Sequence, residues 1–388
     1  MVDFELTEEQ KMLKNTIREF AQKELKPFAR IIDREDRFPY ETWPKMAEIG
    51  LLGMIIPKEY GGLGYSFLDF VVVMEELAAN DVSIANVLGI SLIMCALRIY
   101  EEGNEFQREK YLPALCSGKS IGALGLTEGS GSDAIGAMKT TAIKKGDKYI
   151  INGEKTMVSN GPDCDVCIIY AKTAPEKRQR GVSAFIIELS FPGITKGKKY
   201  EKMGCAGMLT CPIGFTDCEV PEENLLGEEN KGVGVMVRGL NAERTMAAIG
   251  NVGLARAAFE SSLDFAKKQI AFEQPIIKFE MIQEKFANMA ASIEAGRLLT
   301  YKAAWTVDHE VSPSTQNLAC SLAKLVTSDM VVQVTNLALD VTAAYGYFKD
   351  RDEERYLRDA RMIIPGAGSQ EIQRIIIAEE LEKNYQSP

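Results

Sequence analysis

The chain has 388 residues, of which 46% are hydrophobic and 26% are charged. This composition is typical of a soluble globular protein with a sizeable core, and it excludes a disordered chain, a collagen and a small disulfide scaffold. The 45 basic and 55 acidic residues give a net charge of −10. Such an acidic balance disfavours general binding to nucleic acids or anionic membranes.

The sequence shows no sign of export or membrane insertion. We find no apolar run that approaches the ~20 residues needed to span a bilayer. The first ten residues, MVDFELTEEQ, lack both the basic start and the apolar stretch of a secretory signal. We therefore expect a cytoplasmic protein that neither inserts into a membrane nor binds nucleic acid.

The eight cysteines are expected to be reduced thiols, because the chain is long and carries no export signal. Cys164 and Cys167 form a C-x-x-C pair, but a zinc or iron–sulfur site needs a second close pair or nearby histidines. His309 is the only histidine, so Ser-His-Asp and Cys-His catalysis are disfavoured as well. We expect no metal, and a thiol–metal protein stays only as a third functional hypothesis.

Residues 1–121 have the pattern of an all-α domain. Thr7 and Gln10 form a capping box ahead of apolar residues that recur at helical spacing. The stretch from Leu68 to Arg98 is apolar and alanine-rich, as expected of buried bundle helices.

A change of character near Gly122 begins a predicted β domain, residues 122–231. Short β-rich runs (KYIING, DVCIIYA, VSAFIIEL and PIGFTDCEV) alternate there with Gly, Asp, Asn and Pro. The helical pattern returns over residues 232–388, which we predict to form a helical bundle domain. Because strands and helices do not alternate, a doubly wound α/β fold is disfavoured, and we predict an α+β chain of three domains.

The glycine-rich stretches fail the criteria for nucleotide-binding motifs. Gly118-Lys119-Ser120 ends like a P-loop, but Pro113 occupies the position of the required glycine. The stretch Gly129–Gly136 has Ala134 where a dinucleotide motif ends in glycine, and it precedes strands rather than a helix. What remains is LTEGSGSD, residues 126–133, whose backbone amides can hold an anion or the carbonyl edge of a flat ring.

Six ordered segments give the chain a recognisable pattern. They are PKEYGGLG (57–64), KYLPALCSGKSIGALGLTEGSGSD (110–133), INGEKTMVSNG (151–161), VPEENLLGEENKG (220–232), AERTMAAIGNVGLARAAFE (242–260) and YLRDAR…GSQEIQR (356–374). Together they resemble the acyl-CoA dehydrogenase family over essentially the whole chain. The resemblance implies an N-terminal helical domain, a central β-barrel-like domain and a C-terminal four-helix bundle, in agreement with the patterns above.

The resemblance also implies a flavoprotein reaction. Family members bind FAD between the β domain and the bundle, usually as tetramers, and remove an α-proton and a β-hydride from a CoA thioester. Electron transfer flavoprotein usually reoxidises the flavin. The chemistry needs a hydrogen-bonded thioester oxygen and a carboxylate base in a dry site, and FAD supplies the hydride acceptor. We therefore expect an acyl-CoA dehydrogenase, or an enzyme that runs the reverse enoyl-CoA reduction.

Matched position by position, the family's contacts to the chain's own flavin fall on two segments. Thr127 is expected to hydrogen-bond the polar edge of the ring, and Ser132 to lie near the phosphates. Met157 stands where an aromatic residue usually covers the flavin, and Ser159 replaces the family's threonine. The residues expected at the flavin are Leu126, Thr127, Gly131, Ser132, Met157 and Ser159.

The expected catalytic base departs from the commonest family pattern. Ala367 occupies the place of the usual glutamate, so it cannot take a proton, although its N–H can still donate to the thioester oxygen. Some relatives place the base on another helix, at the position of Glu243, which we expect in the first turn of a helix, where the helix dipole alone would also favour it. Asn241 and Arg244 fall where the family contacts CoA and supports the base. The sequence resembles crotonobetainyl-CoA reductases in both respects: they lack the base in the Gly/Ser segment near Ala367 and carry a Glu-Arg pair at the positions of Glu243 and Arg244.

A second group of departures affects contacts that the family makes to a neighbouring subunit's FAD. The family's R-x-x-F-G appears here as Gln269 to Glu273, with Phe272 retained, and its Q-x-x-G-G-x-G begins at Asp340 and has Ala344 at the second glycine. The lost arginine and the added carboxylates should weaken FAD binding, because like charges near the pyrophosphate repel. The loss of glycine should weaken it too, because a side chain blocks the close approach of the backbone. We expect either a homotetramer or a heterotetramer with a homologous subunit, and we hypothesise that such a subunit donates the missing contacts. The alternative function is a flavin-poor or non-catalytic family subunit.

Overall fold

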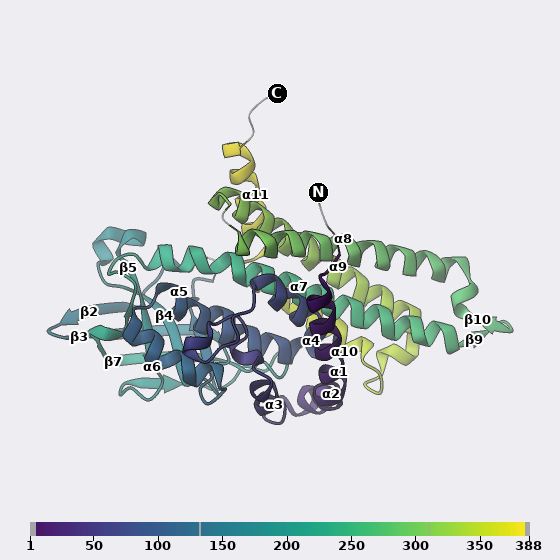
Figure 1. The fold of residues 1–388 in the computed structure, drawn as a ribbon, viewed down its shortest axis with the longest axis horizontal. Coiled ribbons are helices and arrows are strands. Elements are labelled where there is room, and N and C mark those ends of the chain that lie inside the picture. The colour runs from purple at the N-terminus through teal and green to yellow at the C-terminus, as the bar shows by residue number, and fades with distance from the viewer. Residues whose placement is uncertain (1–4, 132, 310, 385–388) are drawn as a thin grey trace.

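The computed structural model describes residues 5–131, 133–309 and 311–384. Helices, strands and helices follow one another along the chain in the predicted order. The molecule is elongated: the large sheet lies at one end, and the long helices extend to the opposite end, which carries a small two-stranded hairpin (Figure 1).

The N-terminal part is helical, as the sequence predicts. Its capping box is present, because Thr7 Oγ1 accepts the Gln10 N–H and Gln10 Oε1 accepts the Thr7 N–H, each at 3.2 Å. A π-helical segment, Ile90–Ala96, continues one helix into the next. The helices are α1 (Glu8–Glu24), α2 (Lys26–Glu35), α3 (Trp43–Glu48), α4 (Phe67–Gly89), α5 (Leu97–Glu102) and α6 (Glu105–Cys116).

Two helical stretches are long and apolar enough to cross a membrane by length and composition alone. The run Phe67–Glu102 has a mean hydropathy of 2.0 over its most apolar window, and 94% of that window is buried inside the protein. Pro313–Tyr347 reaches 1.2, with 61% buried. The sequence search missed both stretches because scattered polar residues interrupt every apolar run. Because both stretches are largely buried inside the protein, they are typical of core helices, whose apolar side chains contact other parts of the protein rather than lipid.

The middle part is an eight-stranded, largely antiparallel sheet in the order β6-β7-β3-β2-β4-β5-β8, with β1 paired to β4 in parallel. The four β-rich runs of the sequence lie in β3, β4, β5 and β7. The strands are β1 (Gly122–Gly125), β2 (Thr141–Lys145), β3 (Lys148–Ser159), β4 (Val166–Lys172), β5 (Val182–Glu188), β6 (Ile194–Lys196), β7 (Thr210–Pro221) and β8 (Leu225–Leu226).

Both faces of the central strands are buried. In β4, Cys167 and Ile169 pack into the core between the strands, whereas Ile168 and Tyr170 pack against the helical core. All eight cysteines are buried and unbridged, and burial raises the pKa of the Cys164 thiol to about 12. Among residues 5–131, 133–309 and 311–384, no cluster of histidine, cysteine and acidic side chains could hold a metal ion.

The C-terminal part is a bundle of long helices. Helix α7 runs from the β-sheet to a small hairpin, β9 (Ile270–Ala271) and β10 (Gln274–Pro275), at the far end of the molecule (Figure 1). It packs against α4, α8 and α9. The bundle helices are α7 (Gly232–Lys268), α8 (Glu280–Asp308), α9 (Pro313–Tyr347), α10 (Glu353–Ala360) and α11 (Gln370–Asn384).

Helices α4 and α7 approach unusually closely around a buried pair of carboxylates. A Cβ at Gly253 of α7 would lie 2.6 Å from the Glu75 carbonyl oxygen, so only glycine fits there. Glu75 and Glu76 are fully buried, and Arg256 of α7 binds them at 2.9 and 2.6 Å. Arg297 of α8 also binds Glu75, at 3.1 Å. This cluster fixes α7 against the N-terminal helices.

One residue of α9 has a backbone conformation that suits glycine. Ala343 has φ 49° and ψ −133°, in a region that L-residues rarely adopt. It lies in the stretch where the sequence carries alanines in place of the family's glycines. A strained backbone of this kind costs about 1–3 kcal/mol.

We predict that Ala343→Gly stabilises the protein by about 1 kcal/mol, because glycine adopts this conformation without a Cβ clash. Urea denaturation measures the change. The matched control is Ala344→Gly, at an exposed helical position, which should destabilise by about 1 kcal/mol. Equal destabilisation by both substitutions would show that Ala343 is unstrained.

Candidate active site

The loop of residues 126–131 is anchored by a buried carboxylate. Glu128 Oε1 lies 2.7 Å from Lys155 Nζ on β3, and the Lys155 side chain is fully buried. The same carboxylate accepts the Thr140 hydroxyl at 2.7 Å and the N–H groups of Lys139 and Thr140 at 2.6 and 3.1 Å. Burial alone would raise the pKa of Glu128, but the bonds from Lys155, Thr140 and Lys139 outweigh it and hold that pKa below its ordinary value.

This anchor brings the two sequence segments with expected flavin contacts side by side. The Thr127 carbonyl accepts the Thr156 N–H at 2.9 Å, and β3 has a register shift between Lys155 and Val158. At that irregularity Met157 takes φ 52° and is 56% exposed.

The polar groups of this surface are free for a ligand. No hydrogen bond from the hydroxyl of Thr127 or Ser159 is found among the described residues, and a Cβ on Gly131 would meet open space. Leu126 is half-buried and packs against the helical core. Free hydroxyls, an exposed apolar side chain and an open glycine turn fit the edge and face of a flavin ring. Ser132 lies outside the described residues.

Glu243 lies in the interior of α7, so the expectation that it sits in the first turn of a helix was wrong. The helix begins at Gly232, about three turns earlier, because its N-terminal residues Val233–Leu240 continue the helical pattern. The helix dipole therefore does not explain this carboxylate. Burial raises its pKa, with Arg244, Arg98 and Lys324 acting in the opposite direction. A half-buried carboxylate with a raised pKa has the character of a general base.

Asn241 and Arg244 are buried and turned toward α9. Arg244 Nη1 donates to Asn241 Oδ1 at 3.0 Å, and Asn241 Nδ2 donates to Gln316 and Asn317 at 3.0 and 2.9 Å. The Asn241 amide is thus used within the protein, where it orients Arg244. The Arg244 Nε has no partner among the described residues, so it remains a buried donor.

Ala367 belongs to the turn that precedes α11. It has φ 53° and packs against the helical core between α10 and α11. Lys324 of α9 connects the two parts, because its Nζ donates to the Ile364 carbonyl at 3.4 Å and its charge acts on Glu243.

The remaining expected cofactor contacts lie far from this site, at the end of the molecule that carries β9 and β10 (Figure 1). Phe272, at the hairpin tip, is 91% exposed, and Gln269 donates to the Ile270 carbonyl. Asp340 pairs with Lys285 of α8 at 3.1 Å, so its charge is partly neutralised. Ala344 is exposed on α9. One chain therefore does not bring these residues to the Thr127 loop.

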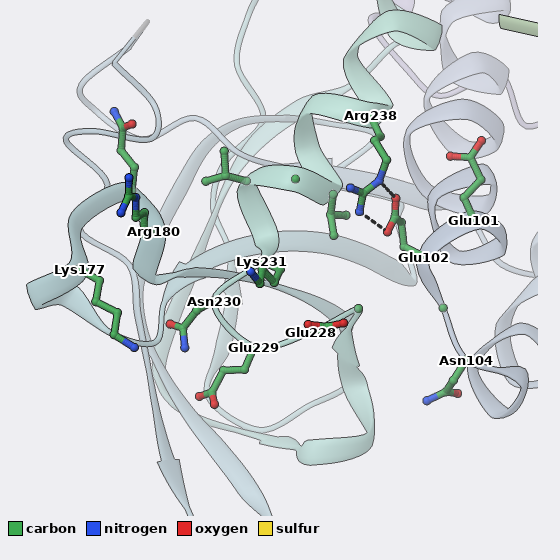
Figure 2. Close-up of a pocket in the computed structure, with 16 residues that line it drawn as sticks. Glu101, Glu102, Asn104, Lys177, Arg180, Glu228, Glu229, Asn230, Lys231 and Arg238 are labelled. Atoms are coloured by element: carbon green, nitrogen blue, oxygen red, sulfur yellow. Dashed lines mark hydrogen bonds and ion pairs between the residues drawn. The ribbon is translucent and has the colours of Figure 1, made fainter. Parts of the chain in front are cut away.

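A cavity of about 1300 Å³ opens beside the first turns of α7, and the sequence analysis did not identify it. Figure 2 shows Lys177 and Arg180 on one side and Arg238, which binds Glu102 at 2.6 Å, on the other. Glu228 and Glu229 lie between them. The basic run of residues 177–180 in an acidic chain was the available signal.

We predict that Lys155→Met destabilises the protein by about 3–5 kcal/mol, because it leaves the Glu128 carboxylate buried without a cation. Thermal unfolding followed by circular dichroism measures the change, and flavin absorbance should fall with it. Lys139→Met is the control, since it removes an exposed lysine side chain and keeps the N–H that Glu128 accepts. Unchanged stability in Lys155→Met would show that the pair does not anchor the loop.

Comparisons with known proteins cover nearly the whole chain. The family models for the N-terminal, middle and C-terminal domains of acyl-CoA dehydrogenase match residues 7–119, 123–218 and 230–382. The acryloyl-CoA reductase (NADH) of Anaerotignum propionicum is 42% identical over 98% of this chain and 96% of its own length. An acyl-CoA dehydrogenase of Bacillus subtilis is 39% identical over 97% of this chain and 98% of its own length.

Solved structures agree with this. Glutaryl-coenzyme A dehydrogenase in complex with glutaryl-CoA has a TM-score of 0.94 at 37% identity, covering 98% of this chain and 96% of that one. The FAD complex of PigA has a TM-score of 0.93 at 28% identity, covering 98% and 99%. The fold, FAD as the cofactor and oxidoreductase chemistry on acyl-CoA are thereby confirmed, and nothing supports the alternative of a non-catalytic subunit. The chain belongs to the acyl-CoA dehydrogenase family of flavin-dependent oxidoreductases.

Proposed function

We propose that this protein interconverts a saturated and an α,β-unsaturated acyl-CoA thioester with Glu243 as the base. The observation that carries the proposal is the half-buried Glu243 carboxylate, which has a raised pKa and no hydrogen-bond partner among the described residues. Ala367 occupies the alternative position and has no proton-accepting side chain.

The proposed reaction divides the work between Glu243 and the backbone of Ala367. The Glu243 carboxylate takes the proton from the carbon next to the thioester carbonyl, and the electron pair left behind forms the new double bond. The Ala367 N–H donates to the carbonyl oxygen, where negative charge develops. Bound FAD supplies the acceptor for the hydride that leaves the β-carbon. In the reverse direction protonated Glu243 returns the proton.

We assign the flavin contacts of the chain to the loop of residues 126–131 and to the irregular end of β3. The Thr127 hydroxyl donates to the polar edge of the ring, Met157 covers its face, and Ser159 adds a second hydroxyl. Leu126 supplies apolar contact, and Gly131 keeps the turn open. The Glu128–Lys155 pair supports this assignment because it orders the loop without using those hydroxyls.

The cavity beside α7 is the proposed entrance for CoA. Lys177, Arg180 and Arg238 can pair with phosphate groups, and Arg238 lies little more than one turn before Glu243. A CoA chain that enters there reaches Glu243 by following α7. Arg244 supports the base, and Asn241 orients Arg244 rather than touching CoA.

The separation of the hairpin from the Thr127 loop supports a proposal about subunit assembly. We propose that Gln269, Phe272, Asp340 and Ala344 act on the FAD of a neighbouring subunit in a tetramer. The strain at Ala343 and the lost arginine favour a neighbour that is a different, homologous subunit. The Lys285–Asp340 pair reduces the repulsion between Asp340 and the FAD phosphates, and so weakens one argument against an identical neighbour.

We further propose a cytoplasmic enzyme with electron transfer flavoprotein as its redox partner. A chain from a structural study of the electron transferring flavoprotein of Acidaminococcus fermentans is 37% identical, with a TM-score of 0.95 and coverage of 99% and 100%. The acryloyl-CoA reductase relative supports the reductive direction as the second possibility.

Glu243→Gln should lower the rate of α-proton abstraction by about 10²–10⁴-fold, because the amide cannot accept the proton. Exchange of substrate α-protons for deuterium in D₂O, followed by mass spectrometry, measures this step apart from hydride transfer. Wild-type exchange should fall as the pH drops through the raised pKa of Glu243, since only the carboxylate form acts. Glu260→Gln, exposed on the same helix, is the control. Unchanged exchange in Glu243→Gln excludes the assignment.

We predict that the chain expressed alone carries less than one FAD per subunit, because the contacts to a neighbour's FAD are altered. The visible spectrum and native mass spectrometry of the purified protein measure flavin content and assembly together. Co-expression with a homologous partner should restore the flavin. A homotetramer with one FAD in every subunit would exclude the unlike partner.

A further inference from the structure

The turn Ile364–Gly368 carries the only group that we assign to the thioester oxygen, the Ala367 N–H. That N–H donates to no other group within the described ranges, so it is available to a ligand. Ala367 and Gly368 have φ values of 53° and 81°. Two consecutive residues with positive φ are costly to hold, and the Ala367 N–H makes no hydrogen bond that would stabilise the turn. Contacts from other parts of the protein must therefore hold the turn in place.

Gln373 of α11 supplies part of this support. Its side chain is buried, and its Nε2 donates to the carbonyl oxygens of Ala367 and Gly368, both at 3.2 Å. Because carbonyl oxygens only accept, the amide nitrogen must face the turn. The contact is tight, since a Cβ on Gly368 would come within 2.8 Å of that nitrogen.

Lys324 of α9 supports the start of the same turn. The side chain is fully buried, and its Nζ donates to the Ile364 carbonyl. Burial lowers the pKa of this ammonium to about 8, opposed by Glu371 and assisted by Arg244. Burying an ammonium without a close carboxylate costs desolvation free energy, whereas apolar contacts could hold the turn without burying a charge.

We propose that Gln373 and Lys324 are positioning residues that hold the turn Ile364–Gly368 so that the Ala367 N–H points at the thioester oxygen. The three bonds come from two different helices, and all of them end on carbonyl groups of this five-residue turn. They leave its N–H donor free. The inference rests on the proposed function, which gives that donor its role.

The test compares Gln373→Met and Lys324→Met with matched controls in the flavin-loaded protein. Gln370→Met lies on the same helix and loses only a bond to Asp329, and Lys302→Met removes an exposed lysine. Circular dichroism establishes folding, titration with the acyl-CoA gives its Kd, and deuterium exchange at the α-carbon gives the rate of proton abstraction. The substrate is the thioester that the wild type exchanges fastest in a panel of straight and branched acyl groups.

On the pH-independent plateau above the pKa of Glu243, where the loss of the Lys324 charge no longer changes the protonation of the base, we expect α-proton exchange to slow by about tenfold or more in Gln373→Met and Lys324→Met. Kd should change by less than about twofold, because the oxygen gains its negative charge only as the proton leaves. The controls should exchange like the wild type. If Gln373→Met does not fold, Gln373→Asn draws the amide away from the turn while the site stays polar.

Three results would overturn the proposal: wild-type exchange in both variants, slowing of the same size in the controls, or a loss that is confined to Kd. Glu243→Gln separates this failure from a failure of the proposed function. If that variant stops exchange and the Gln373 and Lys324 variants do not, only the positioning role is wrong. If it exchanges normally, the base assignment itself is wrong.

Discussion

The buried carboxylates of Glu75 and Glu76 set the main constraint on this structure. Two adjacent negative charges inside a protein are tolerated only when cations bind them, and here Arg256 and Arg297 come from two bundle helices. Arg18 of α1 also binds Glu76, at 3.0 Å. The cluster therefore forms only when the N-terminal helices and the bundle are assembled. It fixes α7, the helix that carries Glu243, against both of them.

The same principle applies to the groups around the proposed active site. Glu128 and Lys155 bury a charge pair below the loop of residues 126–131, and Gln373 and Lys324 place buried donors behind the turn that contains Ala367. In each case the buried polar groups bind the backbone or each other. The groups that would meet cofactor or substrate stay free, which is the arrangement that preorganised catalysis needs.

The expected cofactor contacts do not all lie together in one chain. The loop between β1 and β2, which contains Thr127, lies at the sheet end of the molecule, whereas the hairpin of β9 and β10, which contains Phe272, lies at the opposite end (Figure 1). A helix of the length of α7 separates them, so in the proposed assembly the hairpin would act on the cofactor of a neighbouring subunit. The strained Ala343 belongs to the α9 segment that we propose to act on a neighbouring subunit's FAD. Replacing a glycine there therefore affects both the local backbone energy and the proposed contact between subunits.

The sequence by itself determined the order of helical, β and helical parts, the capping box at Thr7 and the six segments that carry the family resemblance. These features depend on neighbouring residues, whose spacing the sequence displays directly. Only the tertiary structure decided that Glu243 lies inside a helix, that Asn241 turns toward α9 and that Lys155 neutralises Glu128. It also identified the cavity at Arg238 and the buried course of α4. The physical reason is that burial and charge pairing depend on residues distant in the sequence, and only the packed fold brings them together.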